Sequence, residues 1–182
     1  MSIHYRHWTV EDLPAIQKLL LDTWLSTYAS FIPKSDLRFY HGKTYSLEAL
    51  NAMREDPAIK GFVAVEDSSV VGFARTRYAR EEQRFYVSSI YIRPDFQKQG
   101  IGKQLMVIAA DEARALGLDR LWIGVMEQNV DALEWYKKFG YCVVEQAPFT
   151  MGATTVNHFI GYVPVRSLPQ QAAAQSATPS KE

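Results

Sequence analysis

The stretch IYIRPDFQKQGIGKQLM (90–106) constrains the fold of this chain more than any other. Its first residues, 90–92, form a strand-like run, which Pro94 ends because the residue before a proline is conformationally restricted. Gly100 and Gly102 follow in a polar, basic loop, and an apolar pattern of helical period starts directly after them. The first turn of a helix leaves backbone N–H groups unbonded, and glycine lets an anion approach them. The stretch therefore predicts a strand–loop–helix unit that either binds a phosphate group or forms an ordinary tight turn.

The composition predicts one soluble globular domain in a reducing compartment. The chain has 182 residues, 47% of them apolar and 22% charged, which is enough for a substantial core. Its 20 basic and 20 acidic side chains cancel, which argues against a nucleic-acid partner bound by bulk charge. Cys142 is the single cysteine, so no internal disulfide can form. With no apolar signal core or membrane span in the sequence, we expect a cytoplasmic protein with no membrane partner.

Hydrophobic periodicity predicts alternating strands and helices. Strands are expected at 3–8, 61–66, 70–78, 84–92, 121–125, 141–145 and 156–165. Helices are expected at 9–28, where Thr9 and Asp12 resemble a capping box, at 35–55 with an interruption near His41-Gly42, at 102–116 and at 129–139. This order predicts an α/β (α+β) domain over 1–166, with a mixed central sheet of about seven strands flanked by helices. The small, polar segment 167–182 is interpreted as a flexible tail.

The glycine loop matches neither of the common nucleotide-binding motifs. A Walker A loop needs Gly-Lys-Ser/Thr, which residues 100–104 do not supply, and Leu105 stands where a dinucleotide fingerprint has its third glycine. The remaining pattern is Gln-x-x-Gly-x-Gly, from Gln97 to Gly102. This pattern, after the strand and Arg-Pro, resembles the acetyl-CoA loop of the GCN5-related N-acetyltransferase (GNAT) superfamily.

A second block, LWIGVMEQNVDALEWYKKFGY (121–141), also resembles that family. Asn129 and Tyr136 lie seven residues apart and so share one helix face. Asn129 is also suited to be a helix N-cap, and Tyr136 to be a half-buried core aromatic. Within the family, the glycine loop, the late helix and the segments TWLSTYASFIP (23–33) and FTMG (149–152) are most similar to PaiA-type polyamine N-acetyltransferases.

The resemblance implies a GNAT fold with a splayed cofactor gap between the fourth and fifth strands. The backbone of Ile90 and Ile92 would pair with the pantetheine arm of acetyl-CoA, Tyr91 would point to the opposite face, and the pyrophosphate would lie over 98–103. The implied cofactor-binding residues are Ile90, Tyr91, Ile92, Gln97, Lys98, Gln99, Gly100, Ile101, Gly102, Lys103 and Asn129. The acceptor would enter from the other side, near the end of the first helix and the loop 149–152, so Tyr28, Glu127 and Phe149 are expected to bind it.

The implied chemistry is attack of a neutral amine on the acetyl thioester. Removing the proton of an amine with a pKa near 10.4 costs about 4 kcal/mol at neutral pH. Many GNAT enzymes carry a glutamate for this step where Gly124 stands here, and Glu127 is the substitute expected, although it could be a solvated charge. Tyr136 is expected to help the thiolate leave, either by a hydrogen bond to the sulfur or through a lowered pKa.

The sequence thus predicts an N-acetyltransferase acting on a primary amine of a small molecule, such as the polyamine spermidine. Alternatives are an acyl-CoA sensor without turnover, and a GNAT enzyme acting on a protein or another amine. No metal is expected, because His4, His7, His41 and His158 lack metal-ligand spacing. Cys142 is interpreted as a small core residue. By analogy with the family, the strand 158–165 could serve as the edge of a homodimer.

Overall fold

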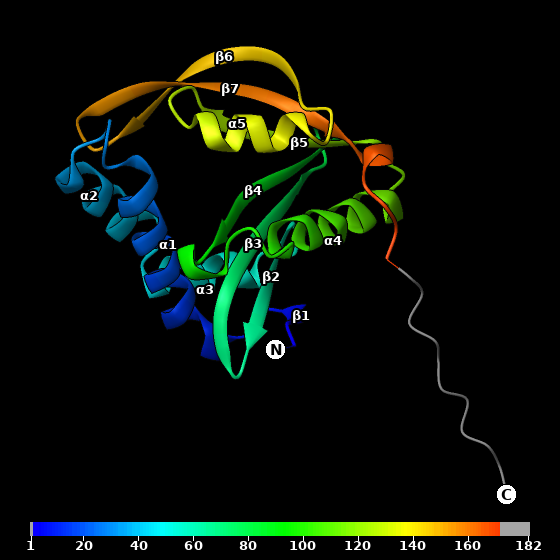
Figure 1. The fold of residues 1–182 in the computed structure, drawn as a ribbon, viewed down its shortest axis with the longest axis horizontal. Helices are drawn as coiled ribbons and strands as arrows, with labels where there is room; N and C mark the ends of the chain where they lie inside the picture. The colour runs from blue at the N-terminus through cyan, green and yellow to red at the C-terminus, as the bar shows by residue number, and fades with distance from the viewer. Residues whose placement is uncertain (1, 172–182) are drawn as a thin grey trace, which may run out of the picture.

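The computed structural model describes residues 2–171, which form one mixed sheet with helices on both faces (Figure 1). The strands are β1 (His4–His7), β2 (Ile59–Glu66), β3 (Ser69–Ala79), β4 (Arg84–Ile92), β5 (Arg120–Met126), β6 (Cys142–Met151) and β7 (Thr154–Pro164). The helices are α1 (Leu13–Tyr28), α2 (Lys34–Thr44), α3 (Leu47–Glu55), α4 (Ile101–Ala115) and α5 (Val130–Lys137), with short 3-10 turns at Val10–Asp12, Pro94–Phe96 and Val165–Ser167. The strand order β1-β2-β3-β4-β5-β7-β6 confirms the predicted seven-stranded mixed sheet.

The sheet divides at its centre, where β4 and β5 run parallel. These two strands are in register only at Phe85 with Leu121 and at Tyr86 with Trp122. Beyond that point β5, β7 and β6 diverge from β4, as Figure 1 shows. From residue 87 onward, one edge of β4 therefore lacks a strand partner, which confirms the predicted splay between the fourth and fifth strands.

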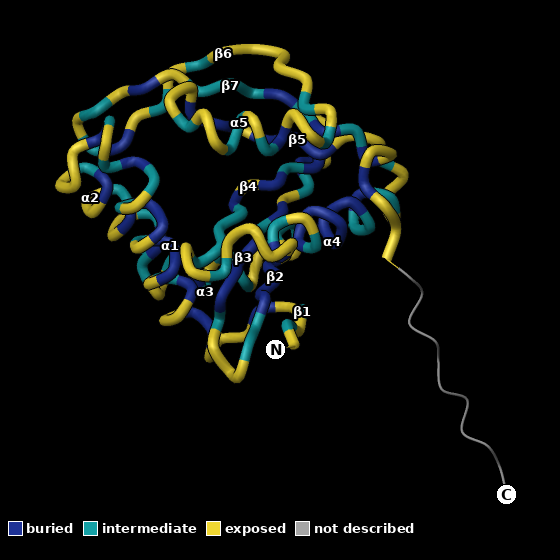
Figure 2. The backbone as a smooth tube through the Cα atoms, in the orientation of Figure 1, coloured by how far each residue is buried: buried dark blue, intermediate teal, exposed yellow. Residues whose placement is uncertain are grey.

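Alternation along the central strands sends side chains to two helical layers. Val63 and Phe73 pack against α1, whereas their neighbours Phe62 and Ala74 pack against α4. Both layers are apolar and almost fully buried, which favours folding by removing hydrocarbon surface from water. Figure 2 shows the contrast with β6, whose course is exposed over most of its length.

The predicted helix at 35–55 is interrupted later than expected. Gly42 lies inside α2, and the chain breaks at Tyr45 and Ser46 instead of near His41-Gly42. The ring of buried His41 hydrogen-bonds the carbonyl of Gln17 at 2.9 Å, which ties this part of α2 to α1. The Ser46 hydroxyl accepts a hydrogen bond from the Ala49 N–H at 3.1 Å and so begins α3.

The late strands differ from the sequence prediction in three respects. The segment 149–152 is the end of β6 and its turn, because β6 continues to Met151 and Gly152 has a φ of +61°. The strand at 158–165 is not an edge: β7 pairs with β5 on one side and β6 on the other, so β6 is the edge strand. Cys142 is exposed on β6 and is therefore not a core residue. The homodimer remains a prediction.

The domain extends past residue 166. Leu168 is buried, and the Arg114 guanidinium donates hydrogen bonds to the carbonyl oxygens of Val165 at 2.8 Å and Leu168 at 2.5 Å. The interpretation of 167–182 as a flexible tail is therefore wrong for 167–171, because α4 holds that segment. Its remainder, 172–182, lies outside the described residues.

An ion pair between exposed Arg6 and buried Asp12 joins the first strand to the turn before the first helix and gives a test of the fold. The Arg6 guanidinium donates to both carboxylate oxygens of Asp12, at 2.6 and 2.9 Å, and the Thr9 N–H donates to the same carboxylate at 2.8 Å. These bonds, led by that from Arg6, lower the pKa of Asp12 despite its burial. We expect Asp12→Asn to lower the free energy of unfolding by about 1–3 kcal/mol at pH 7.

The pH dependence follows from the direction of that shift. Because the folded pKa lies below the ordinary value, the stabilisation is present at neutral pH and is lost as pH falls below about 4. Chemical denaturation at pH 7 and pH 3 measures the free energy of unfolding. The difference in this free energy between wild type and Asp12→Asn should be smaller at pH 3. Asp22→Asn, at an exposed ion pair with Lys18, is the control and should change little. An equal difference in the free energy of unfolding at both pH values would contradict a stabilising role of the ionised Asp12 carboxylate.

Candidate active site

The divergence of β4 and β5 opens a cavity of about 1090 Å³. Its walls come from the ends of α1 and α2, the free edge of β4, the start of α4, β5 and α5, with a contribution from β6 and β7. Sites that enclose small molecules are usually concave and of about 300–1000 Å³, so the space suffices for a cofactor and a second substrate.

The loop before α4 presents backbone donors to this cavity. Its two glutamines hold the loop in shape: the Gln97 amide donates to the Ile92 carbonyl and the Gln99 amide to the Asp95 carbonyl, both at 3.2 Å. Among the described hydrogen bonds, none is donated by a backbone N–H between residues 98 and 103. Because these donors lie at a helix N-terminus, the segment is suited to an anionic group such as a pyrophosphate.

The two glycines of the loop serve different purposes. Gly100 has a φ of +85° as the N-cap of α4, and no atom lies within 4 Å of the position its Cβ would take. It is therefore glycine because of its backbone conformation. Gly102 is glycine because of crowding, since a Cβ there would lie 3.2 Å from the Trp135 ring of α5. Together they let the loop turn sharply and let α5 approach α4.

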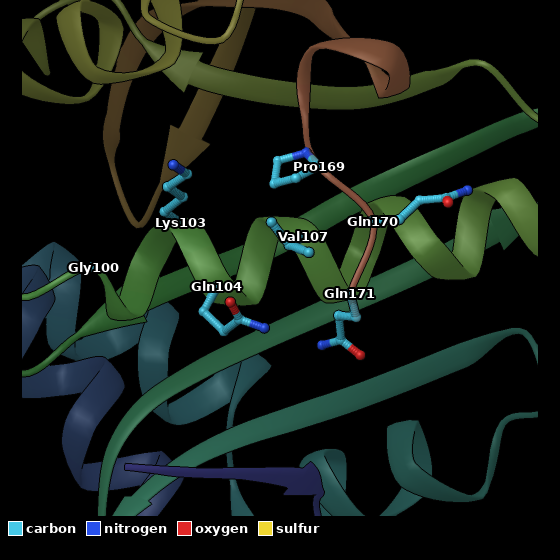
Figure 3. A pocket seen from close by; sticks show the side chains of 7 residues that line it. All are labelled: Gly100, Lys103, Gln104, Val107, Pro169, Gln170 and Gln171. Carbon is cyan, nitrogen blue, oxygen red and sulfur yellow. The ribbon is translucent and has the colours of Figure 1, made fainter. Parts of the chain in front are cut away.

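A second, smaller hollow lies beside the first turns of α4. It measures about 500 Å³ and is lined by Gly100, Lys103, Gln104, Val107, Pro169, Gln170 and Gln171 (Figure 3). Figure 3 shows the segment after Pro169 crossing α4 next to Val107. Lys103 lines both this hollow and the main cavity, so its ammonium group can add positive charge beside the backbone donors.

The free edge of β4 has the geometry expected from the sequence. Ile90 and Ile92 pack toward α4, whereas Tyr91 packs against the α1 layer. The Tyr91 hydroxyl lies 3.5 Å from the Tyr28 hydroxyl of α1. Because one edge of this strand has no partner beyond Tyr86, its backbone groups face the cavity.

Three tyrosines and Asn129 converge where α1, β4 and α5 meet. Burial is the main cause that raises the pKa of Tyr28, of Tyr91 and of Tyr136, so all three hydroxyls stay protonated at neutral pH. Hydrogen bonds from Tyr91 and Asn129 partly offset this shift in the pKa of Tyr28. Asn129 is the N-cap of α5, its side-chain oxygen accepting from the Ala132 N–H at 3.3 Å. Because burial raises the pKa of Tyr136, the predicted alternative, a Tyr136 hydroxyl with a lowered pKa, is wrong.

Tyr136 is 4% exposed and lines the cavity. None of the hydrogen bonds within residues 2–171 uses its hydroxyl, although its ring packs against Trp135 and Tyr141. Its O–H is therefore free to donate to a group in the cavity, and the ring packing fixes its direction.

An aromatic wall surrounds the end of the cavity near α1 and α2. We define it as Trp24, Tyr28, Phe31, Tyr40 and Phe149, all of which line the cavity. Tyr40 lies 5.9 Å from Trp24 and 5.7 Å from Phe149 between ring centroids. The sequence predicts Tyr28 and Phe149 as acceptor-binding residues but does not indicate Tyr40. Which face of α2 lines the cavity depends on how α2 packs on β6, which is a tertiary contact.

Glu127 does not lie at the site. It is absent from the residues lining the cavity, and its carboxylate accepts a hydrogen bond from Gln146 at 3.2 Å. Glu127 follows the last residue of β5; its N–H donates to the Asn157 carbonyl of β7 at 3.0 Å, and its carboxylate is directed to Gln146 on β6. The structure thus brings Tyr28, Asn129, Tyr136 and Phe149 together and leaves Glu127 outside.

His158 on β7 is a cavity residue that the sequence did not indicate. Its ring lies over Gly124 of β5, where a Cβ would approach the imidazole Cδ2 to 3.0 Å and Nε2 to 3.5 Å. The ring also contacts Phe149 at 5.5 Å between centroids. Only the pairing of β5 with β7 brings residues 124 and 158 together, so no local sequence signal could have identified this contact.

Comparison with known proteins agrees with this geometry. The family model described as the acetyltransferase (GNAT) family matches residues 15–141, which include the loop, α4, β5 and α5. The chain belongs to the GNAT family. Its members are N-acetyltransferases, and this chain is therefore assigned to the acyltransferases.

Individual relatives of this GNAT protein act on different acceptors by name. Streptothricin acetyltransferase of Streptomyces lavendulae is 35% identical over 107 residues, which cover 57% of this chain and 57% of that protein. Spermidine N(1)-acetyltransferase of Thermoplasma acidophilum is 25% identical over 147 residues, covering 79% of this chain and 90% of the relative. The crystal structure of PaiA N-acetyltransferase from the same organism, in complex with coenzyme A, superimposes with a TM-score of 0.78 at 23% identity, covering 90% of this chain and 99% of that one. This structural likeness shows the fold.

Within residues 2–171 of this GNAT chain, no helix is both long and apolar enough to cross a membrane. The same residues contain no group of three or more His, Cys, Asp or Glu side chains placed to hold a metal ion. A cytoplasmic location remains a prediction.

Proposed function

We propose that this GNAT enzyme transfers the acetyl group of acetyl-CoA to a primary amine of a small cationic molecule, with spermidine as the first candidate. The observation that carries the proposal is the aromatic wall at the acceptor end of the cavity. A ternary complex is expected, because the anion-binding loop and the aromatic wall lie at different ends of one cavity.

The residues of the cofactor end fit acetyl-CoA, which supplies an activated acetyl thioester. The backbone donors at 98–103, with Lys98 and Lys103, would hold the pyrophosphate. The unpaired edge of β4 at Ile90 and Ile92 would pair with the amides of the pantetheine arm as a neighbouring strand does. A backbone N–H on this edge would also stabilise negative charge on the carbonyl oxygen during transfer.

The aromatic wall is suited to hold a second ammonium group of the acceptor. Aromatic faces attract cations, with about 0.5–2 kcal/mol for each favourable contact. A polyamine carries several amines, so one can rest on the wall while another reacts. The names of the relatives that acetylate spermidine and streptothricin support an amine acceptor of small size.

One observation favours a second candidate, an acyl-CoA sensor without turnover. Gly124 stands where many GNAT enzymes carry a glutamate, and Glu127 does not reach the cavity to replace it. Against the sensor, Tyr136 retains a free hydroxyl in the cavity, which binding alone does not require.

The test is an acceptor screen with the full chain. Release of CoA from acetyl-CoA is followed with spermidine, with a monoamine of similar length, and with neutral amines. Spermidine should be the better substrate. Tyr40→Leu should raise the KM for spermidine about tenfold, the equivalent of one cation–π contact, and change the KM for the monoamine less.

Phe39→Leu is the matched control, because Phe39 neighbours Tyr40 on α2 but is 64% exposed. It should leave both KM values unchanged. If Tyr40→Leu raises the KM for spermidine and for the monoamine equally, the aromatic wall does not bind the second ammonium group. Tight acetyl-CoA binding without turnover on any amine would favour the sensor.

A further inference from the structure

The imidazole of His158 occupies the space above Gly124. A side chain at position 124 would meet the ring, since even a Cβ would come within 3.0 Å of Cδ2. The absence of a glutamate at position 124 of β5 and the position of His158 on β7 are therefore linked, because only glycine at 124 leaves room for the ring over β5. The ring lines the cavity together with Gly124, Met126 and Phe149.

The hydrogen bonding of the ring defines its neutral tautomer. His158 Nδ1 lies 2.8 Å from the carbonyl oxygen of Ala147 on β6. A carbonyl oxygen can only accept, so Nδ1 must carry the proton of this bond. In the neutral ring Nε2 then has a free lone pair. None of the hydrogen bonds within residues 2–171 uses Nε2, which lies on the ring edge above Gly124.

We propose that His158 is the catalytic base of acetyl transfer, accepting the proton of the acceptor amine at Nε2. The proposal rests on the proposed function and names the group that replaces the absent β5 carboxylate. Protonation at Nε2 keeps the Nδ1–H bond to Ala147 intact, so the ring can take a proton without losing its position.

The step balances as follows. Nε2 takes one proton from the ammonium form of the acceptor, which becomes a neutral amine. The amine nitrogen attacks the thioester carbonyl carbon, forming the C–N bond, and the C–S bond then breaks with its electron pair on sulfur. The nitrogen loses its second proton, the thiolate gains one and becomes the thiol, and the imidazolium returns its proton to water.

Other titratable and charged groups around the cavity do not compete for this role. Those facing it are Tyr28 on α1, Tyr40 on α2, Tyr45 after α2, Tyr86 and Tyr91 on β4, Tyr136, Asp131, Glu134 and Lys138 on α5, and Lys98 and Lys103 by the loop. The Tyr45 hydroxyl lies 3.5 Å from the Ser89 hydroxyl. Asp36 of α2 lies nearby but bonds the Thr154 hydroxyl at 2.6 Å, and Glu127 bonds Gln146. Burial raises the pKa of Tyr28, Tyr40, Tyr86, Tyr91 and Tyr136, so these hydroxyls stay protonated and do not act as bases. Asp131 and Glu134 belong to α5, and the Glu134 carboxylate accepts a hydrogen bond from the Lys137 ammonium at 2.6 Å.

The test compares wild type and His158→Gln with acetyl-CoA and spermidine from pH 5 to pH 9. Base catalysis of this kind contributes about 10²–10⁴-fold, so kcat should fall by at least about 100-fold at pH 8. A general base acts only in its unprotonated form, so the difference in kcat between the two proteins should narrow as the pH is lowered.

Controls separate this role from a structural one and from failure of the proposed function. His4→Gln, on an exposed position of β1, should keep the wild-type profile. A loss in His158→Gln that is equal at every pH would overturn the inference and leave the acetyltransferase intact. If the wild type acetylates no amine, the proposed function fails, and ring ¹⁵N chemical shifts still test His158. The neutral ring must then be the tautomer with its proton on Nδ1, and a neutral ring with its proton on Nε2 instead would overturn the proposal.

Discussion

Gly100→Val should weaken the binding of acetyl-CoA by at least about 100-fold, the loss expected when two hydrogen bonds to a charged group disappear. Gly100 begins α4 with a φ of +85°, a conformation that costs a β-branched residue about 1–2 kcal/mol. Valine will therefore rotate the peptide out of this conformation and turn the free N–H groups of 98–103 away from the pyrophosphate. Isothermal calorimetry with acetyl-CoA measures the dissociation constant directly.

Gly117→Val supplies the matched control. Gly117 lies just past the opposite end of α4, has a φ of +73°, and like Gly100 has no atom within 4 Å of its Cβ position. Both substitutions introduce the same backbone strain, so both should lower the melting temperature by a similar amount. Only Gly100→Val should alter the affinity for acetyl-CoA. Wild-type affinity in Gly100→Val would remove the loop from the cofactor site.

Tyr136→Phe should lower kcat by about 10–100-fold while the affinity for acetyl-CoA stays nearly constant. Burial raises the pKa of Tyr136, so its hydroxyl remains a donor and does not become a base at any pH of an ordinary assay. A hydrogen bond to a charged group contributes about 1.5–3 kcal/mol, and this one would form fully only as negative charge develops on the leaving sulfur. Single-turnover kinetics with saturating acetyl-CoA isolates the step.

The neighbouring Tyr141→Phe tests whether the effect is chemical. The single proton of the Tyr141 hydroxyl is shared between the carbonyl oxygens of Ile123 and Phe159, each 3.1 Å from the hydroxyl oxygen, which ties the turn before β6 to β5 and β7. Its loss should lower stability and leave kcat close to wild type. If Tyr136→Phe keeps the wild-type kcat, Tyr136 is a packing residue.

The features that sequence could predict are those encoded by neighbouring residues. The glycine loop, the N-cap of α5 at Asn129 and the alternation around Tyr91 each depend on residues a few positions apart, and each lies where the pattern indicated. Local spacing also predicted the number of strands. It could not predict that α2 continues through Gly42, because the hydrogen bond from His41 to α1 is a tertiary contact.

The acceptor half of the site was predicted least well, for the same reason. Glu127 is close in sequence to Gly124, but it lies beyond the end of β5, and its carboxylate is held by Gln146 of β6. His158 and Tyr40 come from elements far from Gly124 in the chain and reach the cavity only through the packing of β7 on β5 and of α2 on β6. A sequence motif identifies the cofactor end of the cavity, because that end is one continuous loop. It does not identify the acceptor end, which is assembled from elements far apart in the sequence.

The short register between β4 and β5 has a consequence for the energetics of the whole molecule. With only two residue pairs in register there, the strands β1 to β4 and the strands β5 to β7 form two units whose opening need not be concerted. A ligand lying along the free edge of β4 and against β5 would join them into one cooperative unit. Its binding free energy would then be added to the stability of the sheet itself, following the ratio of ligand concentration to dissociation constant. Amide hydrogen exchange in the two units should thus become synchronous when the cofactor is bound.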